Sequence, residues 1–420
     1  MSFDRIGVRP DELLLPASHV EKEKWAAVAC DQYTSEPAYW EEADRIVGDS
    51  YSTLRLVLPE ACLAETEKRV PQIHREMERY LCEGVFGPTQ GPSMILLERT
   101  TQSGSRLGLV CTADLEAYDY TDRKTIIRPT EETITSRLPA RQAIRREALL
   151  ETSHVMLLID DPDNTVILPL YERWKNQMDA YDFEAMQGCG HMRGKRIHDP
   201  EELQGICRAL TALMEKQGAD PLVYAVGDGN HSLATAKAHW MELRQTLSPE
   251  EQLTHPARYA MVEVVNIHDP ALSFEPIHRL LMHVEEEELL HSWAQWCEKG
   301  GMALTVGERG EGQPFTFLCG GEERTVWVAG ADDPLPVATL QRFLDAYLAA
   351  HAGAEIDYIH GDDVLRRLSS ETGCAGFLLP PLDKFSFFPS ITKLGTLPRK
   401  TFSMGHANEK RCYMECRVIR

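Results

Sequence analysis

A short turn between two regular segments carries the residue types that phosphate chemistry needs. The apolar run 222–226 is typical of a buried strand, and apolar residues recur at helical spacing over 233–240. Between them, residues 227–232 read Gly-Asp-Gly-Asn-His-Ser. A helix N-terminus presents unsatisfied N–H donors and a partial positive charge, so it can hold an anion. Because Asp228 adds a carboxylate and His231 an imidazole, this turn predicts phosphate chemistry first.

The spacing of this turn leaves two interpretations open. A turn from strand to helix with glycine and an Asn or Asp cap is common, and most such turns bind no ligand. The segment would match the dinucleotide fingerprint only if Ser232 were glycine. The second glycine-rich segment, 188–196, lacks the spacing and the Ser or Thr of a Walker loop. A structural cap and an anion site therefore both remain.

Composition argues against nucleic-acid-binding, membrane-spanning and disulfide-rich proteins. The 420 residues include 65 acidic and 44 basic side chains, a formal net charge of −21, which argues against a nucleic-acid partner. No apolar run approaches the ~18 to 20 residues that span a bilayer, and the N-terminus lacks a signal segment. The eleven cysteines show no disulfide framework and no paired zinc knuckles. We expect a cytoplasmic protein with a small-molecule ligand and no membrane partner.

Strand and helix patterns alternate along the chain. Strand-like runs at 94–98 and 106–111 flank a turn and predict a hairpin, and 155–159 and 259–265 are further buried strands. The expected helices cover 141–150, 200–217, 233–246, 285–299 and 340–350. This alternation predicts an α/β or α+β fold in which helices flank a mixed sheet. The expected lobes are 1–150, 151–300, which contains the Gly-Asp-Gly-Asn-His-Ser turn, and 301–420.

Several segments resemble, in the same order along nearly the whole chain, the family labelled domain of unknown function 1015. The family's Asp-Gly-His-His-Arg turn is similar to residues 228–232, and its Pro-Thr-His-Arg segment to 275–279. Its C-terminal Pro-Pro-Lys-Ser-Thr is similar to 398–401. Looser matches are 30–34, against Pro-Tyr-Asp-Val, and 128–133, against Arg-His-Glu-x-Thr. The shared order makes the resemblance stronger than any one motif.

The hallmark turn departs from the family pattern at two positions. Asn230 stands where the family usually has histidine, and Ser232 where it has arginine. Arginine is a planar, permanently charged group that binds phosphate, so its loss puts the phosphate site in doubt. A phosphate here must be held by backbone amides, His231 and Ser232, or by a cation from elsewhere. The candidates for that cation are Arg279, Arg399 and Lys400.

The resemblance also implies a fold and a reaction. The family's turn is similar to that of the ParB and sulfiredoxin-like nucleotide folds, which include an archaeal kinase that phosphorylates free serine with ADP. This implies one family-length unit over 1–420 that transfers phosphate from ATP or ADP, with Mg²⁺, to a small hydroxylated metabolite such as free serine. The alternative is a non-catalytic regulatory protein that binds a nucleotide or metabolite, which the missing arginine favours.

The expected site follows from this chemistry. Asp228 is the expected catalytic carboxylate and Mg²⁺ ligand, Glu131 is a second catalytic carboxylate, and His231 bonds a phosphate oxygen. The expected residues that bind substrate or phosphate are Gly227, Gly229, Asn230, Ser232, His278, Arg279, Arg399, Lys400 and Asp31. Each has a structural alternative, such as an Asp228 cap or a buried structural histidine. The chain could also self-associate as a homo-oligomer.

Overall fold

The chain forms two compact units. The computed structural model describes every residue except 1, 35, 122–124, 134–137, 219 and 399, and it describes the backbone alone for 138–140. The first unit comprises 1–272 and 405–420, and the second comprises 273–404. The end of the chain therefore belongs to the unit built mainly from the N-terminal two thirds. The sequence predicted three lobes instead, and their boundaries stay a prediction.

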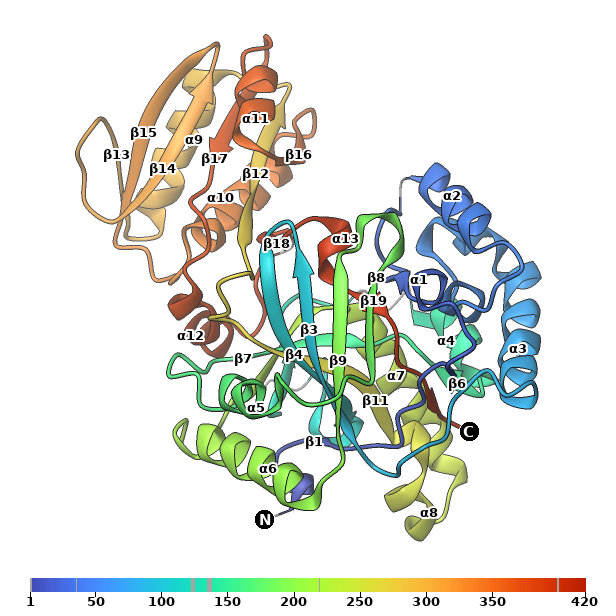
Figure 1. The fold of residues 1–420 in the computed structure, drawn as a ribbon. Helices are drawn as coiled ribbons and strands as arrows, with labels where there is room; N and C mark the ends of the chain where they lie inside the picture. The colour runs from blue at the N-terminus through green and yellow to red at the C-terminus, as the bar shows by residue number, and fades with distance from the viewer. Residues whose placement is uncertain (1, 35, 122–124, 134–137, 219, 399) are drawn as a thin grey trace. The chain divides into compact units, whose positions relative to one another are not determined.

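A mixed sheet forms the centre of the first unit (Figure 1). Its strands are β1 (Val8–Arg9), β3 (Met94–Thr101), β4 (Gly104–Asp114), β5 (Ile127–Pro129), β7 (Val155–Ile159), β8 (Tyr181–Glu184), β9 (His191–Ile197), β10 (Tyr224–Asp228) and β11 (Tyr259–Asn266). Their order is β5-β10-β7-β11-β4-β3-β9-β8, with β1 paired to β4. β10 runs parallel to β5, and β11 parallel to β7. The other described pairs are antiparallel.

Helices and short strands surround this sheet. The helices are α1 (Lys22–Trp25), α2 (Pro37–Val47), α3 (Thr66–Cys82), α4 (Leu138–Arg146), α5 (Ile167–Trp174), α6 (Pro200–Glu215), α7 (Asn230–Leu243), α8 (Pro249–Thr254) and α13 (Ala407–Lys410). Two short pairs join the C-terminal segment to the rest of the unit. They are β2 (Ala27–Val28) with β19 (Cys412–Tyr413), and β6 (Leu150–Glu151) with β20 (Arg417–Val418).

Alternation along the central strands fills a core on each face of the sheet. Ile95 and Leu97 of β3 pack in a core that also contains Met414 of the C-terminal segment. Leu96, between them, packs in the opposite core with Leu233 of α7. Successive residues of a strand point to opposite faces, so this pattern requires that both faces be covered. The C-terminal segment is therefore part of the first unit's core.

The second unit is an antiparallel sheet with helices. Its strands are β12 (Phe274–Met282), β13 (Ala303–Val306), β14 (Gln313–Cys319), β15 (Glu322–Ala329), β16 (Glu355–His360), β17 (Cys374–Leu378) and β18 (Phe402–Met404), and its helices are α9 (Glu286–Lys299), α10 (Pro336–Ala350), α11 (Asp362–Ser369) and α12 (Lys384–Leu394). The order is β13-β15-β14-β17-β12-β16, with β18 paired to β12. Trp293 of α9 stacks on Phe343 of α10 with ring centroids 5.2 Å apart.

The structure confirms the predicted fold class, a mixed sheet with flanking helices, and corrects one helix. The pattern over 141–150 predicts a single helix, but α4 ends at Arg146, and Leu150 begins strand β6. Leu150 is 1 % exposed and pairs with Val418. Pairing with a segment distant in sequence overrides the local helix propensity here. None of the described helices is long and apolar enough to cross a membrane.

Candidate functional site

The turn after β10 begins helix α7 without a side chain at its cap. β10 ends at Asp228 and α7 begins at Asn230, so Gly229 is the N-cap residue. Gly229 has a φ of +88° and a ψ of 28°, the left-handed conformation that favours glycine. A Cβ at this position would lie 3.2 Å from Arg411 Nη1 and 3.3 Å from Val155 Cγ2. Both the backbone and the close approach of Arg411 therefore require glycine here.

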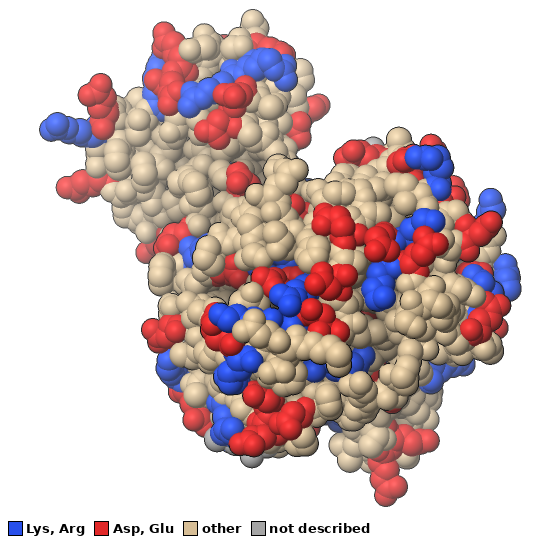
Figure 2. Space-filling model, viewed as in Figure 1, with Lys and Arg blue, Asp and Glu red and all other residues tan. Residues whose placement is uncertain are grey.

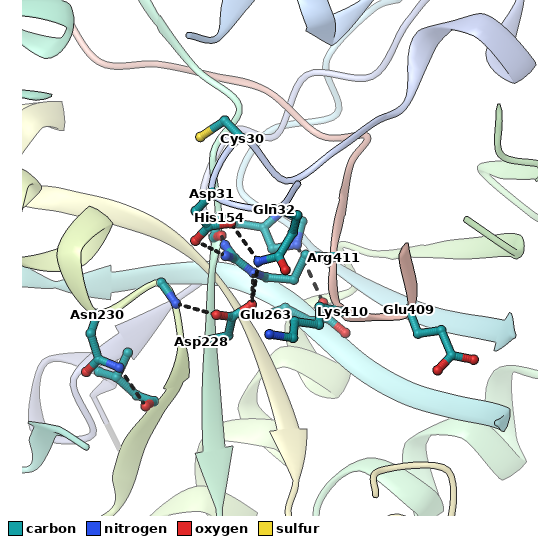
Figure 3. Close-up of polar contacts among 12 residues, drawn as sticks. Cys30, Asp31, Gln32, His154, Asp228, Asn230, Glu263, Glu409, Lys410 and Arg411 are labelled. Atoms are coloured by element: carbon teal, nitrogen blue, oxygen red, sulfur yellow. Dashed lines mark hydrogen bonds and ion pairs between the residues drawn. The ribbon is translucent and has the colours of Figure 1, made fainter. Parts of the chain in front are cut away.

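Arg411 lies between two carboxylates that come from distant parts of the sequence (Figure 3). Its Nη2 donates to Asp31 Oδ2 at 2.6 Å, and its Nε donates to Asp228 Oδ2 at 3.1 Å. Its Nη1 donates to the carbonyl oxygen of His154. The Arg411 side chain is fully buried, whereas those of Asp31 and Asp228 are 18 % and 17 % exposed. A ligand can therefore reach the two carboxylates of this Asp31–Arg411–Asp228 cluster but not its guanidinium.

The charges of the cluster keep Asp31 and Arg411 ionised. Burial alone would raise the pKa of Asp31, but Arg411, a hydrogen bond from Gln32 and the nearby Lys410 together hold that pKa below its ordinary value. Burial disfavours the charge on Arg411, yet Asp228 and Asp31 raise its pKa well above the ordinary value. Two carboxylates against one guanidinium leave the cluster with one net negative charge. A cation placed against its exposed edge would be attracted.

Main-chain pairing positions Asp31 and Arg411. β2 lies just before Asp31 and pairs antiparallel with β19, which begins directly after Arg411. Ala29 N donates to the carbonyl oxygen of Arg411 at 3.0 Å. Nearby, Trp25 Nε1 donates to the carbonyl oxygen of Met414 at 2.8 Å. These bonds hold the two segments in register, so that side chains 380 residues apart in sequence can meet.

Asn230, a predicted phosphate ligand, uses its amide to bind Thr130, which lies outside the turn. Its Oδ1 accepts from Thr130 N at 3.1 Å, and its Nδ2 donates to Thr130 Oγ1, also at 3.1 Å. Thr130 follows β5, the parallel neighbour of β10. Because parallel strands end at the same edge of a sheet, the backbone of Glu131 lies at the edge where Asp228 lies. Asn230 therefore joins two strand ends, and its role as a phosphate ligand stays a prediction.

The other residues of the predicted turn lie beside a pocket. Gly227, His231 and Ser232 are each half-buried. Ser232 lines a pocket together with Cys30, the residue before Asp31. Burial, with help from Asp31, raises the pKa of the Cys30 thiol to about 12, so this thiol is neutral at ordinary pH. The structure thus brings the predicted residues of the turn together with Asp31 and the Glu131 backbone.

His278 belongs to the second unit, where both of its ring nitrogens have partners. Nε2 lies 2.9 Å from Asp362 Oδ1, and Nδ1 accepts from Leu379 N at 3.1 Å. The residue is 1 % exposed. Burial lowers the pKa of His278 although Asp362 opposes the shift. These contacts match the structural alternative that the sequence left open.

Arg279 and Lys400, two of the predicted cations, also belong to the second unit. Arg279 is fully buried, and its Nη1 donates to the carbonyl oxygens of Ile277 at 2.6 Å and of Lys400 at 3.0 Å. Its Nε donates to Gln341 Oε1 at 2.7 Å. The side chain of Lys400 is exposed. Arg399 lies outside the described residues.

A buried ion pair supports the cluster. Arg106 Nη2 lies 3.3 Å from Glu263 Oε1, and His154 Nε2 lies 3.5 Å from Glu263 Oε2. Burial would raise the pKa of Glu263, but Arg106 and His154 lower it to about 2. The backbone of His154 in turn accepts the hydrogen bond from Arg411. His154 therefore links the Asp31–Arg411–Asp228 cluster to the buried Arg106–Glu263 ion pair.

Sequence reasoning missed three residues of this site, Gln32, Lys410 and Arg411. Gln32 Nε2 donates to Asp31 Oδ1 at 3.0 Å and to Asp228 Oδ2 at 3.5 Å. One signal was available, since Lys410 and Arg411 are adjacent cations that directly precede the less polar residues 412–414. Nothing in that pattern relates them to Asp31, because the contact depends on the pairing of β2 with β19.

Comparison with known proteins places the chain among relatives. The family model described as protein of unknown function (DUF1015) matches residues 13–347. The fold is similar to that of a free serine kinase in complex with AMP, with 11 % identity and a TM-score of 0.38, covering 74 % of this chain and 91 % of that chain. It is also similar to SbnI with a C-terminal truncation from Staphylococcus aureus, with 12 % identity and a TM-score of 0.38, covering 73 % and 85 %. No curated protein sequence shows a significant match.

Proposed function

The chain belongs to the DUF1015 family, and we propose that it is a nucleotide-dependent phosphotransferase for a small hydroxylated metabolite, with free serine as the first candidate. One observation carries the proposal: Arg411 holds Asp31 and Asp228 in place beside the N-terminus of α7, and both carboxylates keep an exposed edge. Phosphoryl transfer depends mainly on positioning and on charge stabilisation. These groups supply both.

Each part of the turn has a proposed role. Asp228 orients the acceptor hydroxyl and accepts its proton. The first N–H groups of α7, together with the helix dipole, face a phosphate, and His231 bonds one of its oxygens. Glu131 is the second carboxylate at the same sheet edge. Gly229 N donates to Asp228 Oδ1 at 3.1 Å, which holds that carboxylate at the start of the helix.

The carboxylate pair fits Mg²⁺ that arrives with a nucleotide. Among the described residues, no group of three or more His, Cys, Asp or Glu side chains could hold a metal ion by itself. Mg²⁺ is usually held by one or two carboxylates together with phosphate oxygens and water. Asp31 and Asp228 would be its protein ligands, and when bound the ion would neutralise charge on the phosphates.

Lys410 is the proposed replacement for the arginine that the hallmark turn lacks. Arg411 cannot contact a phosphate because it is fully buried and bonded to Asp31, Asp228 and a carbonyl oxygen. Lys410 is half-buried and lies close enough to Asp31 to lower the pKa of that carboxyl. Its ammonium can therefore interact with an anion at the exposed edge of the cluster.

A non-catalytic sensor of nucleotide or metabolite is the second candidate. The observation that favours it is Ser232, which leaves the turn without a guanidinium on the phosphate. Backbone amides can keep affinity for an anion while transition-state stabilisation is lost. Metal-independent binding without turnover would support this candidate.

A small molecule is the proposed partner in either case. The net charge of −21 supports this choice over nucleic acid. Figure 2 shows acidic side chains interspersed with basic ones on the face in view. We further propose a cytoplasmic location, while self-association into a homo-oligomer stays a prediction.

The test is ³¹P NMR of the full chain with Mg²⁺ and ATP or ADP, with and without a panel of hydroxyl amino acids that includes serine. We expect a phosphomonoester signal that depends on the acceptor and falls about a hundredfold or more in Asp228→Asn. The matched control is Asp114→Asn, because Asp114 accepts from Arg258 Nε at 2.9 Å in the same unit. Equal activity in the two variants would contradict the site.

A further inference from the structure

A pocket beside the turn is not used by the nucleotide site as described. Its volume, taken as the space open to the centre of a water-sized sphere, is about 110 Å³. An apolar cavity of about 150 Å³ is enough to bind benzene. The walls come from Cys30, residues 56–63, α3, α4, residues 150–153, the start of α7 and the C-terminal segment, all in the first unit. The pocket therefore has room for a small molecule with several carbon atoms.

One end of the pocket is polar and adjoins the cluster. Cys30 precedes Asp31, and Ser232 lies in the first turn of α7 after Asp228. Glu60 N donates to the carbonyl oxygen of Cys30 at 2.8 Å. Thr235 continues the hydroxyl-bearing face of α7 from Ser232, one turn further along. A hydroxyl held beside Cys30 and Ser232 would therefore lie against the two segments to which Asp31 and Asp228 belong.

The remaining wall is mostly aliphatic. It includes Leu56, Leu58, Leu63, Met77, Ile144 and Ala148. Most of these side chains are buried in the folded chain, and Leu63 and Ile144 are half-buried. Free serine has a single side-chain methylene, which would leave most of this surface without apolar contact. A ligand with an aliphatic body would remove that surface from water.

The charged residues of the pocket are paired with each other. Arg141 Nε donates to Glu60 Oε1 at 3.2 Å, and Arg145 forms an ion pair with Glu151. Each pair cancels its own charge, so the pocket offers no excess charge to an ionic ligand. This favours a ligand whose body is uncharged overall, with its phosphate-accepting hydroxyl at the polar end.

We propose that this pocket binds the phosphoryl acceptor, and that the acceptor is a primary alcohol with an aliphatic body of several carbons. The inference rests on the proposed phosphotransferase function and names its acceptor class. The hydroxyl oxygen forms a bond to the terminal phosphorus of a nucleoside di- or triphosphate. The bond from that phosphorus to the bridging oxygen breaks, and its electron pair leaves with the nucleotide. The hydroxyl proton passes to Asp228 and then to solvent.

The experiment uses the full chain and straight-chain primary alcohols from ethanol to 1-hexanol, with free serine for comparison. Binding is measured without nucleotide by saturation-transfer NMR, and turnover with Mg²⁺ and ATP or ADP by ³¹P NMR. We expect affinity to rise about threefold to fourfold with each methylene until the pocket is full, which is the fold-change for burying one CH₂. Phosphoester formation should follow the same order.

One variant that fills the pocket and one matched variant outside it provide the structural control. Ala148→Leu should abolish the dependence on chain length while nucleotide affinity stays unchanged. Ala212→Leu adds the same volume at an exposed position of α6 and should change nothing. If the thermal midpoint shows that Ala148→Leu is unfolded, Ile144→Phe on the same wall replaces it, because Ile144 is only half-buried.

The outcomes separate the two proposals. Chain-length-dependent binding that Ala148→Leu removes, with no phosphoester from any alcohol, would support the pocket and overturn the phosphotransferase. A phosphoester from serine with no dependence on chain length would support the phosphotransferase and overturn the pocket as its acceptor site. Binding that rises with chain length equally in Ala148→Leu would also overturn the pocket, because the alcohols would then bind elsewhere.

Discussion

Arg411 in the first unit and Arg279 in the second are both fully buried, yet the two units use this side chain differently. Arg411 donates to the carboxylates of Asp31 and Asp228, which raise its pKa. Arg279 donates to an amide and to carbonyl oxygens, and its guanidinium carbon lies 4.7 Å from the ring centroid of Tyr358. Burial lowers the pKa of Arg279 to about 10. Arg411 thus belongs to a charged cluster that a ligand can reach, whereas Arg279 is held by neutral acceptors inside the second unit.

The sharpest test of this difference removes each arginine in turn. Arg411→Met removes the buried guanidinium that both carboxylates contact and should cost the first unit about 3–5 kcal/mol of unfolding free energy. Arg279→Met leaves neutral acceptors and should cost the second unit about 1–3 kcal/mol. Hydrogen exchange read by mass spectrometry measures this, because peptides from β19 and α7 report on the first unit and peptides from β12 on the second. Equal losses of unfolding free energy in the two units would show that the carboxylate partners of Arg411 make no difference.

The sequence predicted the local elements of the site well but the contacts between distant segments poorly, and the reasons are physical. Residues 222–243 alternate between strand and helix patterns that local chemistry determines, and the structure confirms β10 and α7 there. Asp31 was proposed from a loose family match, but its partner Arg411 was not found. That contact depends on the register of β2 with β19, which no local pattern encodes. Arg279 was selected for its charge, which does not reveal what the guanidinium contacts.

The second test keeps Arg411 but crowds its guanidinium with an added methyl group. Gly229→Ala adds a Cβ 3.2 Å from Arg411 Nη1, at a φ of +88°. Gly218 has a φ of +86° with nothing within 4 Å of the same position, so Gly218→Ala measures the backbone strain alone. That strain is about 1–2 kcal/mol for one residue. We expect Gly229→Ala to cost about 1 kcal/mol more than Gly218→Ala, because overpacking adds to the strain.

Thermal unfolding of the Gly229→Ala and Gly218→Ala variants, compared with the unmodified chain, measures the loss of unfolding free energy in each variant. The Asp31–Arg411–Asp228 geometry should also shift in Gly229→Ala, with a loss of nucleotide affinity that Gly218→Ala does not show. If the two variants lose the same stability and affinity, Arg411 has room to move, and the cluster is less rigid than its hydrogen bonds indicate.

Acid should affect the two units in different pH windows. The folded-state pKa of Glu263 is lowered from 4.5 to about 2, so its stabilisation is present above pH 4.5 and is lost as the pH falls towards 2. His278 is a base whose pKa is lowered from 6.5 by burial, so its folded-state advantage is present above pH 6.5 and declines below it. Calorimetry of Glu263→Gln and His278→Asn against the unmodified chain, from pH 8 to pH 2, gives two difference curves.

The loss of unfolding free energy in Glu263→Gln, about 1–2 kcal/mol at pH 7, should persist at pH 5. A deficit that disappears there would mean that Arg106 does not hold Glu263 ionised.

The smallest expected effect compares two lysines. Lys410 lies near Asp31 in the first unit, and Lys400 is an exposed residue of the second whose backbone carbonyl, rather than its ammonium, holds Arg279. Under the proposed function, Lys410→Ala should weaken nucleotide binding about fivefold to tenfold, or ~1 kcal/mol, and Lys400→Ala should leave it unchanged. Titration calorimetry at two salt concentrations measures both, and the Lys410 contribution should shrink at the higher one because salt screens it. Equal weakening by both substitutions would indicate a general attraction between the nucleotide and positive charge. Lys410 would then be no substitute for the arginine missing from the turn, and the difference between the two units would lie in their buried arginines alone.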